Sequence, residues 1–252
     1  TSAPFAYTWA TAPAGSHTLT AVAVDDDGAR TTSGAVTISV TAASGGGQTV
    51  TLRDGLNGYA GTRDAFISEN ALTANSGSDP SLVDQQAAGT KRHRSLVKFA
   101  IVSGDGGPLP VGATVTSATL SLYKHSYYNH TYRLRPLLSA WVESEVTWSQ
   151  RLAGVPWVGP GATAVGSDLS LSYDAEAAAP WDPGWVTFDV TSGVQAIASG
   201  RPNHGWALEA VSGNSNFKEF RSSEYTADLS LRPRLIISYT VGTPNAPPSV
   251  AL

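Results

Sequence analysis

The chain of 252 residues contains no cysteine and no methionine, and charged residues make up only 14% of it. The lack of cysteine excludes a disulfide framework, a thiolate metal site and a thiol nucleophile. No apolar run approaches the roughly 20 residues that span a bilayer, so the sequence predicts no membrane insertion. The first residue, Thr1, and the lack of methionine lead us to expect a piece of a longer precursor.

Long stretches of helical periodicity are also missing, and short alternating segments take their place. Alternation of apolar and polar residues is typical of strands with one buried face and one solvated face. Turn residues recur about every 8–15 positions, which favours one all-β sandwich or barrel. The segments concerned are RHRSLVKF (92–99), SATLSLY (117–123), WVESEVTW (141–148), WVTFDVT (185–191), NHGWALE (203–209), FRSSE (220–224) and RPRLIISY (232–239).

Residues 1–43 have the pattern of a separate, incomplete domain. Strands are expected over residues 5–10, 17–25 and 35–41, with a tight hairpin turn at Asp25–Gly28. Three strands do not close a sandwich, and the pattern around Trp9 and Pro13-Ala14-Gly15 resembles the C-terminal strands of bacterial immunoglobulin-like domains. The expected organisation is then a linker at 44–47, a complete domain at 48–241, and a linker with the start of a following repeat at 242–252.

The ordered motifs of the central domain carry a further resemblance. From GLNGYAGTRDAFISEN (55–70) through NSGSDPSL (75–82) to RPRLIISY, they resemble the DNRLRE family, which includes disaggregatase-related repeats. The resemblance implies an all-β, antiparallel β-jelly-roll sandwich. Alginate-binding members of that family are carbohydrate-binding modules, so the resemblance also implies binding of a polysaccharide.

Charge is unevenly distributed along this domain. Residues 85–135 hold seven Lys and Arg against one acid, and residues 136–189 hold seven acids against one Arg. This asymmetry suggests a basic patch opposed by an acidic edge. The domain as a whole is not basic, with 15 Lys and Arg against 17 Asp and Glu, so we expect no nucleic-acid partner.

Alternation places several cations and aromatic residues on solvated faces. Turning Leu134 inward turns its two Arg neighbours outward, and turning Leu122 inward turns Tyr123 outward. If these strands are neighbours, one sheet face carries a ladder of cations with a tyrosine. Arg suits carboxylate recognition, so an acidic polysaccharide such as alginate is the expected ligand. The predicted ligand-binding residues are Arg94, Lys98, Tyr123, His125, Tyr128, Arg133 and Arg135. The plainer interpretation pairs outward Arg side chains with Glu209 or Glu219 across strands.

The resemblance also implies a metal site. Asp64, Asp189 and Glu224 occupy family-like positions and are candidate ligands of a structural Ca²⁺, which such jelly rolls hold through oxygen atoms. In the alternative interpretation, Asp189 caps the helical turn next to it. The histidines show no metal-ligand spacing.

Catalysis is poorly supported. No phosphate loop or nucleophile elbow is present, and nothing in the spacing of Ser, His and Asp indicates a triad. Glu143 and Glu145, two apart, could serve glycoside hydrolysis. The family resemblance implies instead that both acids belong to a structural stretch, in which Trp141 and Trp148 pack and Thr147 forms hydrogen bonds. Trp157 and Trp181 stay open as sugar platforms, whereas Trp185 is expected in the core.

The sequence therefore predicts a non-catalytic carbohydrate-binding module of a secreted or cell-surface multidomain protein. The alternative is a structural or adhesive repeat module, in which the basic region of one repeat pairs with the acidic region of its neighbour. A polysaccharide lyase or hydrolase is a third hypothesis, for which the sequence names no convincing catalytic residue.

Overall fold

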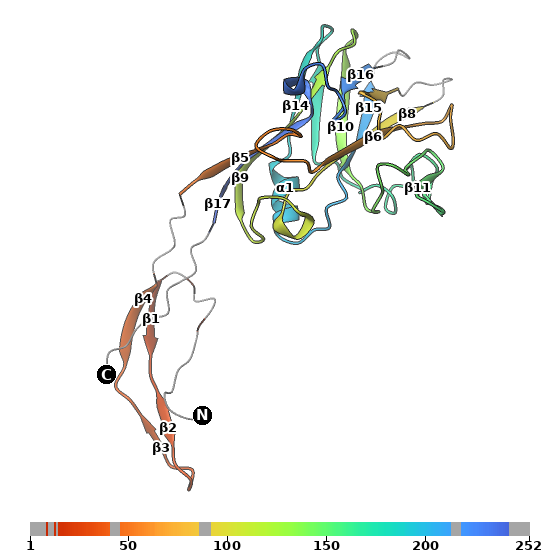
Figure 1. The fold of residues 1–252 in the computed structure, drawn as a ribbon. Coiled ribbons are helices and arrows are strands. Elements are labelled where there is room, and N and C mark those ends of the chain that lie inside the picture. The colour runs from red at the N-terminus through yellow and green to blue at the C-terminus, as the bar shows by residue number, and fades with distance from the viewer. Residues whose placement is uncertain are drawn as a thin grey trace. The chain divides into compact units, whose positions relative to one another are not determined.

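The computed structural model of the protein describes Trp9, Pro13 and residues 15–40, 46–85, 92–212 and 218–241. The chain divides into two compact units, one of residues 47–239 and one of residues 1–46 with 240–252. The fold is almost entirely β, as the sequence predicts (Figure 1). Within the described ranges, no helix is long and apolar enough to cross a membrane.

The smaller unit contains two antiparallel ribbons. Strand β1 (Gly15–Leu19) pairs with β4 (Val36–Val40), and β2 (Val22–Val24) pairs with β3 (Arg30–Thr32). The predicted Asp-Gly turn joins β2 to β3: Gly28 has φ +85°, and its N–H donates to the Asp25 carbonyl at 3.1 Å. The strand expected over residues 5–10 lies outside the described residues, apart from Trp9. The immunoglobulin-like origin of residues 1–43 stays a prediction.

The larger unit is built from two main antiparallel sheets. The five-stranded sheet has the order β13-β10-β15-β8-β6, and the six-stranded sheet has the order β5-β17-β9-β16-β7, with β14 also pairing with β9. The strands of the five-stranded sheet are β6 (Thr62–Ser68), β8 (His93–Phe99), β10 (His130–Pro136), β13 (Ala175–Ala179) and β15 (Trp206–Ser212). Those of the six-stranded sheet are β5 (Gln48–Leu52), β7 (Ser81–Asp84), β9 (Thr114–Lys124), β14 (Gly184–Asp189), β16 (Lys218–Arg221) and β17 (Arg234–Thr240). Chain neighbours such as β9 and β10 lie in opposite sheets, and the sandwich agrees with the expected jelly roll.

The main core lies between these sheets. Alternation directs Leu120 and Leu122 of β9 inward, and both are fully buried. From the opposite sheet, Tyr132 of β10 meets Phe220 of β16 edge to face, with ring centroids 5.3 Å apart. Such aromatic pairs add about 1 kcal/mol to the free energy gained from burial of their area. The inward faces predicted for β9 and β10 are therefore confirmed.

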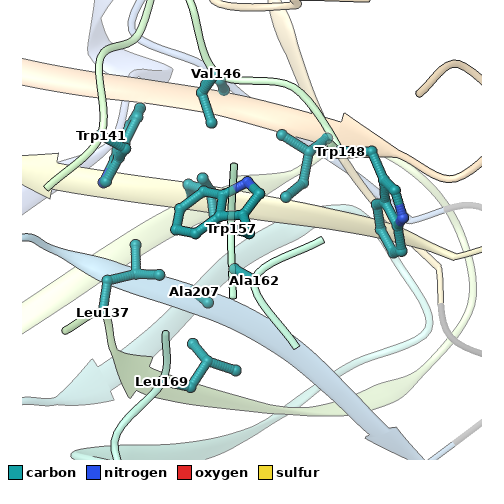
Figure 2. Packing of buried hydrophobic residues seen from close by; sticks show 11 residues of the cluster. Leu137, Trp141, Val146, Trp148, Trp157, Ala162, Leu169 and Ala207 are labelled. Carbon is teal, nitrogen blue, oxygen red and sulfur yellow. The ribbon is translucent and has the colours of Figure 1, made fainter. Parts of the chain in front are cut away.

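A second apolar cluster covers part of the outer face of the five-stranded sheet (Figure 2). Ala65, Ile67, Leu96 and Ala207 come from the sheet, and the segment 137–169 packs three indoles over them. That segment includes the short strands β11 (Gln150–Leu152) and β12 (Val155–Pro156). This outer face is therefore partly closed to solvent.

The packing roles expected for Trp141 and Trp148 are confirmed, as are the hydrogen bonds of Thr147, whose Oγ1 accepts from Ser149 N at 3.2 Å. The expectation of a strand over residues 141–148 is wrong. Those residues form turns, in which Val146 N donates to the Val142 carbonyl at 2.8 Å. Seven residues apart on a strand, the two indoles would face opposite sides; the turns let both join one cluster.

Helix α1 (Thr191–Ala198) packs against β9. The Asp189 carboxylate accepts from Thr191 N at 3.0 Å and from Thr191 Oγ1 at 2.6 Å. These bonds lower the pKa of Asp189. The alternative interpretation of Asp189, as a residue that stabilises the start of the helix, matches this geometry.

Candidate functional site

The predicted ligand-binding residues do not share one face. The five-stranded sheet carries Arg94, Lys98, Arg133 and Arg135. Tyr123 lies on strand β9 of the six-stranded sheet, and His125 comes directly after the end of that strand. The expectation of a single ladder is wrong because it took β9 and β10 as neighbours. The loop 125–129 carries the chain from one sheet to the other, so that adjacent strands in sequence face opposite sides of the sandwich.

The cations of the five-stranded sheet are largely engaged by the protein itself. Arg94 is only 8% exposed, and its Nη1 donates to the Gly161 carbonyl at 2.7 Å. Arg94 and Arg135 flank one carboxylate, that of Glu209, at 3.4 Å and 2.7 Å. Arg135 also donates to the carbonyls of Ser170 and Leu171, so both guanidinium groups have structural partners.

Arg133 is more accessible than these two but is also paired. Its Nε donates to Glu176 on the neighbouring strand β13 at 2.6 Å, and its guanidinium lies 4.5 Å from the Tyr173 ring centroid. The pairing joins the basic and acidic regions of the sequence within one domain. Lys98 is half-buried and forms no ion pair within the described part of the chain.

The outer face of the six-stranded sheet is different. Trp185 of β14 pairs in register with Tyr123 of β9, and their rings meet edge to face at 5.4 Å. Arg234, at the start of β17, places its guanidinium 4.1 Å from the Trp185 ring centroid. All three side chains are half-buried, which leaves part of each in contact with solvent.

A second arginine extends this arrangement. Phe220 pairs with Lys124, so the antiparallel register places Arg221 of β16 beside Tyr123. The guanidinium of Arg221 lies 4.0 Å from the ring centroid of Tyr225. We call Tyr123, Trp185, Arg221, Tyr225 and Arg234 the aromatic–arginine face.

The two arginines of this face are held by rings rather than by acids. Among the described residues, neither Arg221 nor Arg234 forms an ion pair, and the Nε atom of each is buried without a hydrogen-bond partner. Cation–π contact orients a guanidinium without using its N–H donors. Because each Nε is buried, the Nη groups are the donors that remain for an acceptor from outside the protein.

His125 lies close to this face, since the charge of Arg221 reaches it. His125 Nε2 lies 3.3 Å from Ser81 Oγ, and its Nδ1 lies 3.9 Å from Glu219. Burial, and then the charge of Arg221, lowers the pKa of His125 to about 4. Tyr128 meets Trp181, which is 53% exposed, edge to face at 5.1 Å.

Arg221, Tyr225 and Arg234 are not among the predicted ligand-binding residues, and Trp185 was expected in the core. The signal was present, because Phe220 and Leu235 are inward-facing residues and alternation turns Arg221 and Arg234 outward. Trp185 likewise alternates with the buried Val186.

A cavity of about 440 Å³ lies elsewhere, beside the loop after β6. Its lining includes Phe66, Ser76 and Asp79 and contains no Lys or Arg. It therefore offers no cation to an acidic ligand.

Two of the three predicted metal ligands come together. Asp64 and Glu224 meet Glu143, and the ligand atoms of the three carboxylates all lie within 4.8 Å of one another. Asp189 is not part of this group, because it binds Thr191. Burial, and then the charge of Glu224, raises the pKa of Asp64 well above its usual range, and burial raises that of Glu143 to about 7. Glu145, which the sequence pairs with Glu143 as possible acids for glycoside hydrolysis, accepts from Ala153 N at 2.8 Å.

The family model of carbohydrate-binding module family 96 matches residues 58–239. This range includes the five-stranded sheet, the six-stranded sheet except β5 and the last residue of β17, and the whole aromatic–arginine face. No curated protein sequence matches the chain.

Proposed function

The chain belongs to carbohydrate-binding module family 96, and carbohydrate-binding modules are generally non-catalytic. We propose that this chain binds an acidic polysaccharide of the alginate type. The proposed site is the aromatic–arginine face. The observation that carries the proposal is the pair of arginines, Arg221 and Arg234, that rest on aromatic rings without an acidic partner. Since uronate polymers occur outside cells, we propose an extracellular or secreted role.

The chemistry of this face matches that of a polyuronate. Each sugar unit carries one carboxylate, and a guanidinium binds a carboxylate through two parallel N–H donors. The indole of Trp185 and the phenol rings present flat apolar surfaces beside polar groups, which suits a pyranose ring. Trp181 and Tyr128 are candidates for further contacts.

The cations of the five-stranded sheet fit this role less well. Arg94 and Arg135 are mostly buried and share Glu209, and Arg133 is paired with Glu176. A glycan would have to replace these acids, and the segment 137–169 covers part of the same sheet. Binding there stays a prediction that can be compared directly with binding at the aromatic–arginine face.

The test is calorimetric titration of the full chain with alginate, polygalacturonate and a neutral glucan. The double variant Arg221→Gln/Arg234→Gln is compared with Lys98→Gln/Arg133→Gln, which removes the same charge from the other sheet. Hydrogen bonds to charged groups contribute about 1.5–3 kcal/mol each, so we expect the first variant to lose at least about 10-fold in affinity for alginate. The second variant should bind as the wild type does.

Two results would contradict this assignment. A loss confined to Lys98→Gln/Arg133→Gln would move the site to the five-stranded sheet. No binding of any glycan, together with self-association that disappears in salt, would favour the structural repeat module. The pairing of Arg133 with Glu176 already provides an internal partner for charges that the repeat hypothesis assigns to neighbouring copies.

A further inference from the structure

The three carboxylates at the edge of the five-stranded sheet come from distant parts of the chain. Asp64 lies on the edge strand β6, Glu143 in the turn region over that sheet, and Glu224 just after β16 of the other sheet. Asp64 N donates to Glu143 Oε1 at 2.7 Å, and Asp64 Oδ2 accepts from Ser223 N at 2.9 Å. The backbone thus fixes Asp64 toward both other acids.

Two oxygen atoms in this cluster lack a donor. Asp64 is 1% exposed, and its Oδ1 has no hydrogen-bond partner among the described residues. Glu224 Oε1 accepts from Ser223 Oγ at 2.8 Å, but its Oε2 is likewise buried without a partner. A buried anionic oxygen without a donor is costly, so that native structures supply it with a proton, a cation or a donor group.

The charge balance of the ionised cluster favours a cation. The cation paired with this cluster in the described residues is Arg63, whose Nε lies 3.5 Å from Glu143 Oε2 and whose side chain is 51% exposed. With all three acids ionised, the three carboxylates and one guanidinium would carry two net negative charges in a mostly buried site. A divalent cation would balance them without any further group.

From this geometry we propose that Asp64, Glu143 and Glu224 bind one Ca²⁺ ion. All three donors are carboxylate oxygens, which hard cations prefer. Calcium–oxygen bonds of about 2.3–2.6 Å place any two ligands of one ion no more than about 5 Å apart, and the three ligand atoms meet that limit. Mg²⁺ usually keeps several waters, which a buried carboxylate cluster accommodates poorly.

The ion would join the two sheets. Its ligands connect β6 to the segment after β16 and to the turn region that carries Glu143. The site is defined by residues outside the aromatic–arginine face, so the proposal stands or falls independently of glycan binding.

The experiment measures calcium binding by the full chain. Protein treated with EDTA and dialysed at pH 7.5 is titrated with CaCl₂ and with MgCl₂ by calorimetry, and its thermal unfolding is followed by circular dichroism. We expect one Ca²⁺ per chain. At a free Ca²⁺ concentration of about 100 times Kd, mass action should raise Tm by about 5–10 °C. Mg²⁺ should give a smaller increase.

Isosteric variants assign the ligands. Glu224→Gln and Glu143→Gln keep the side-chain volume, and each should weaken Ca²⁺ binding at least 10-fold. Asp189→Asn is the matched control, because it removes a carboxylate that lies elsewhere, and it should keep the full Ca²⁺-dependent increase in Tm.

The proposal is wrong if the wild type gives neither calorimetric heat nor a change in Tm with Ca²⁺. A Tm that falls as pH rises from 5 to 8 and does not respond to Ca²⁺ would show that the carboxylates share protons instead. Wild-type affinity in both Gln variants, each shown to be folded by its circular dichroism spectrum, would also overturn it.

Discussion

Arg234 lies against the indole of Trp185, with its guanidinium carbon 4.1 Å from the ring centroid. The two residues come from β17 and β14, strands that both pair with β9 in the six-stranded sheet. The indole keeps the guanidinium at the surface without neutralising its charge. In this arrangement the ring both orients the cation and offers a platform for a sugar.

This relationship predicts different effects of two substitutions at one position. Trp185→Ala removes the platform and the contact that orients Arg234, so affinity for the acidic glycan should fall about 10-fold, in line with cation–π energies of about 1–2 kcal/mol. Trp185→Phe keeps a ring and should bind within about 3-fold of the wild type. Calorimetric titration of both variants measures this, and equal affinities in Ala and Phe variants would contradict it.

The shared carboxylate on the other sheet predicts an effect on stability. Glu209→Gln leaves Arg94 and Arg135 with a neutral partner in a site where their side chains are only 10% and 15% exposed. Breaking a buried ion pair costs about 3–5 kcal/mol, so the free energy of unfolding should fall by about that amount. Urea unfolding followed by tryptophan fluorescence gives the value.

Glu176→Gln is the matched control for that experiment. The side chains of Glu176 and its partner Arg133 are 39% and 34% exposed, so solvent screens this pair and its loss should lower the free energy of unfolding much less than the loss of Glu209. Similar losses in the two Gln variants would show that Glu209 is not the central partner of a buried network.

The face of each strand could be predicted from the sequence, but the sheet to which it belongs could not. Alternation correctly turned Leu120 and Leu122 of β9 and Leu134 of β10 inward. It carries no information on which strands pair, and a five-residue loop can close a hairpin or cross to the opposite sheet. Tyr123 and Arg133 are therefore on outward faces as expected, although they lie on different sides of the sandwich.

The acidic cluster shows a similar limit. The family resemblance predicts Asp64 and Glu224 as ligands of one ion, but it also predicts Asp189, whose carboxylate accepts from Thr191 N at the start of α1. The stretch that holds Glu143 between two core tryptophans predicts a structural role for this residue. Its position beside Asp64 depends on turns that replace a predicted strand, and a period-2 pattern cannot reveal such turns.

A buried lysine yields a further stability prediction. Lys124 is fully buried, and its Nζ donates to the carbonyls of Tyr128 at 2.7 Å, Trp181 at 3.1 Å and Pro180. Lys124→Met would leave these carbonyls without their shared donor, at a cost of about 3 kcal/mol. Tm should fall by about 6–12 °C. Lys98→Met, at a half-buried site, should change Tm by less than about 2 °C, and an equal change in both would contradict the role of Lys124.

His125 should make the stability depend on pH. Its pKa is about 4 in the folded protein and about 6.5 in an unfolded chain. Between these values the unfolded chain binds more protons, so the contribution of neutral His125 is complete above about pH 6.5 and is lost as pH falls to about 4. The groups around the imidazole are Glu219 at 3.9 Å, Ser81 at 3.3 Å and the charge of Arg221.

The contribution is measured as a difference, because the raised pKa of Glu143 acts in the opposite sense: a carboxyl group with a raised pKa loses stability as pH rises. Unfolding free energies of the wild type and His125→Gln are compared at pH 7.5, 5.5 and 4.5. We expect their difference to shift by about 2 kcal/mol toward the Gln variant between the first and last pH. Parallel profiles would mean that His125 has the same pKa in the folded and the unfolded protein. The burial of His125 between Ser81 and Glu219 argues against this, because protonation there would place a second cation beside Arg221.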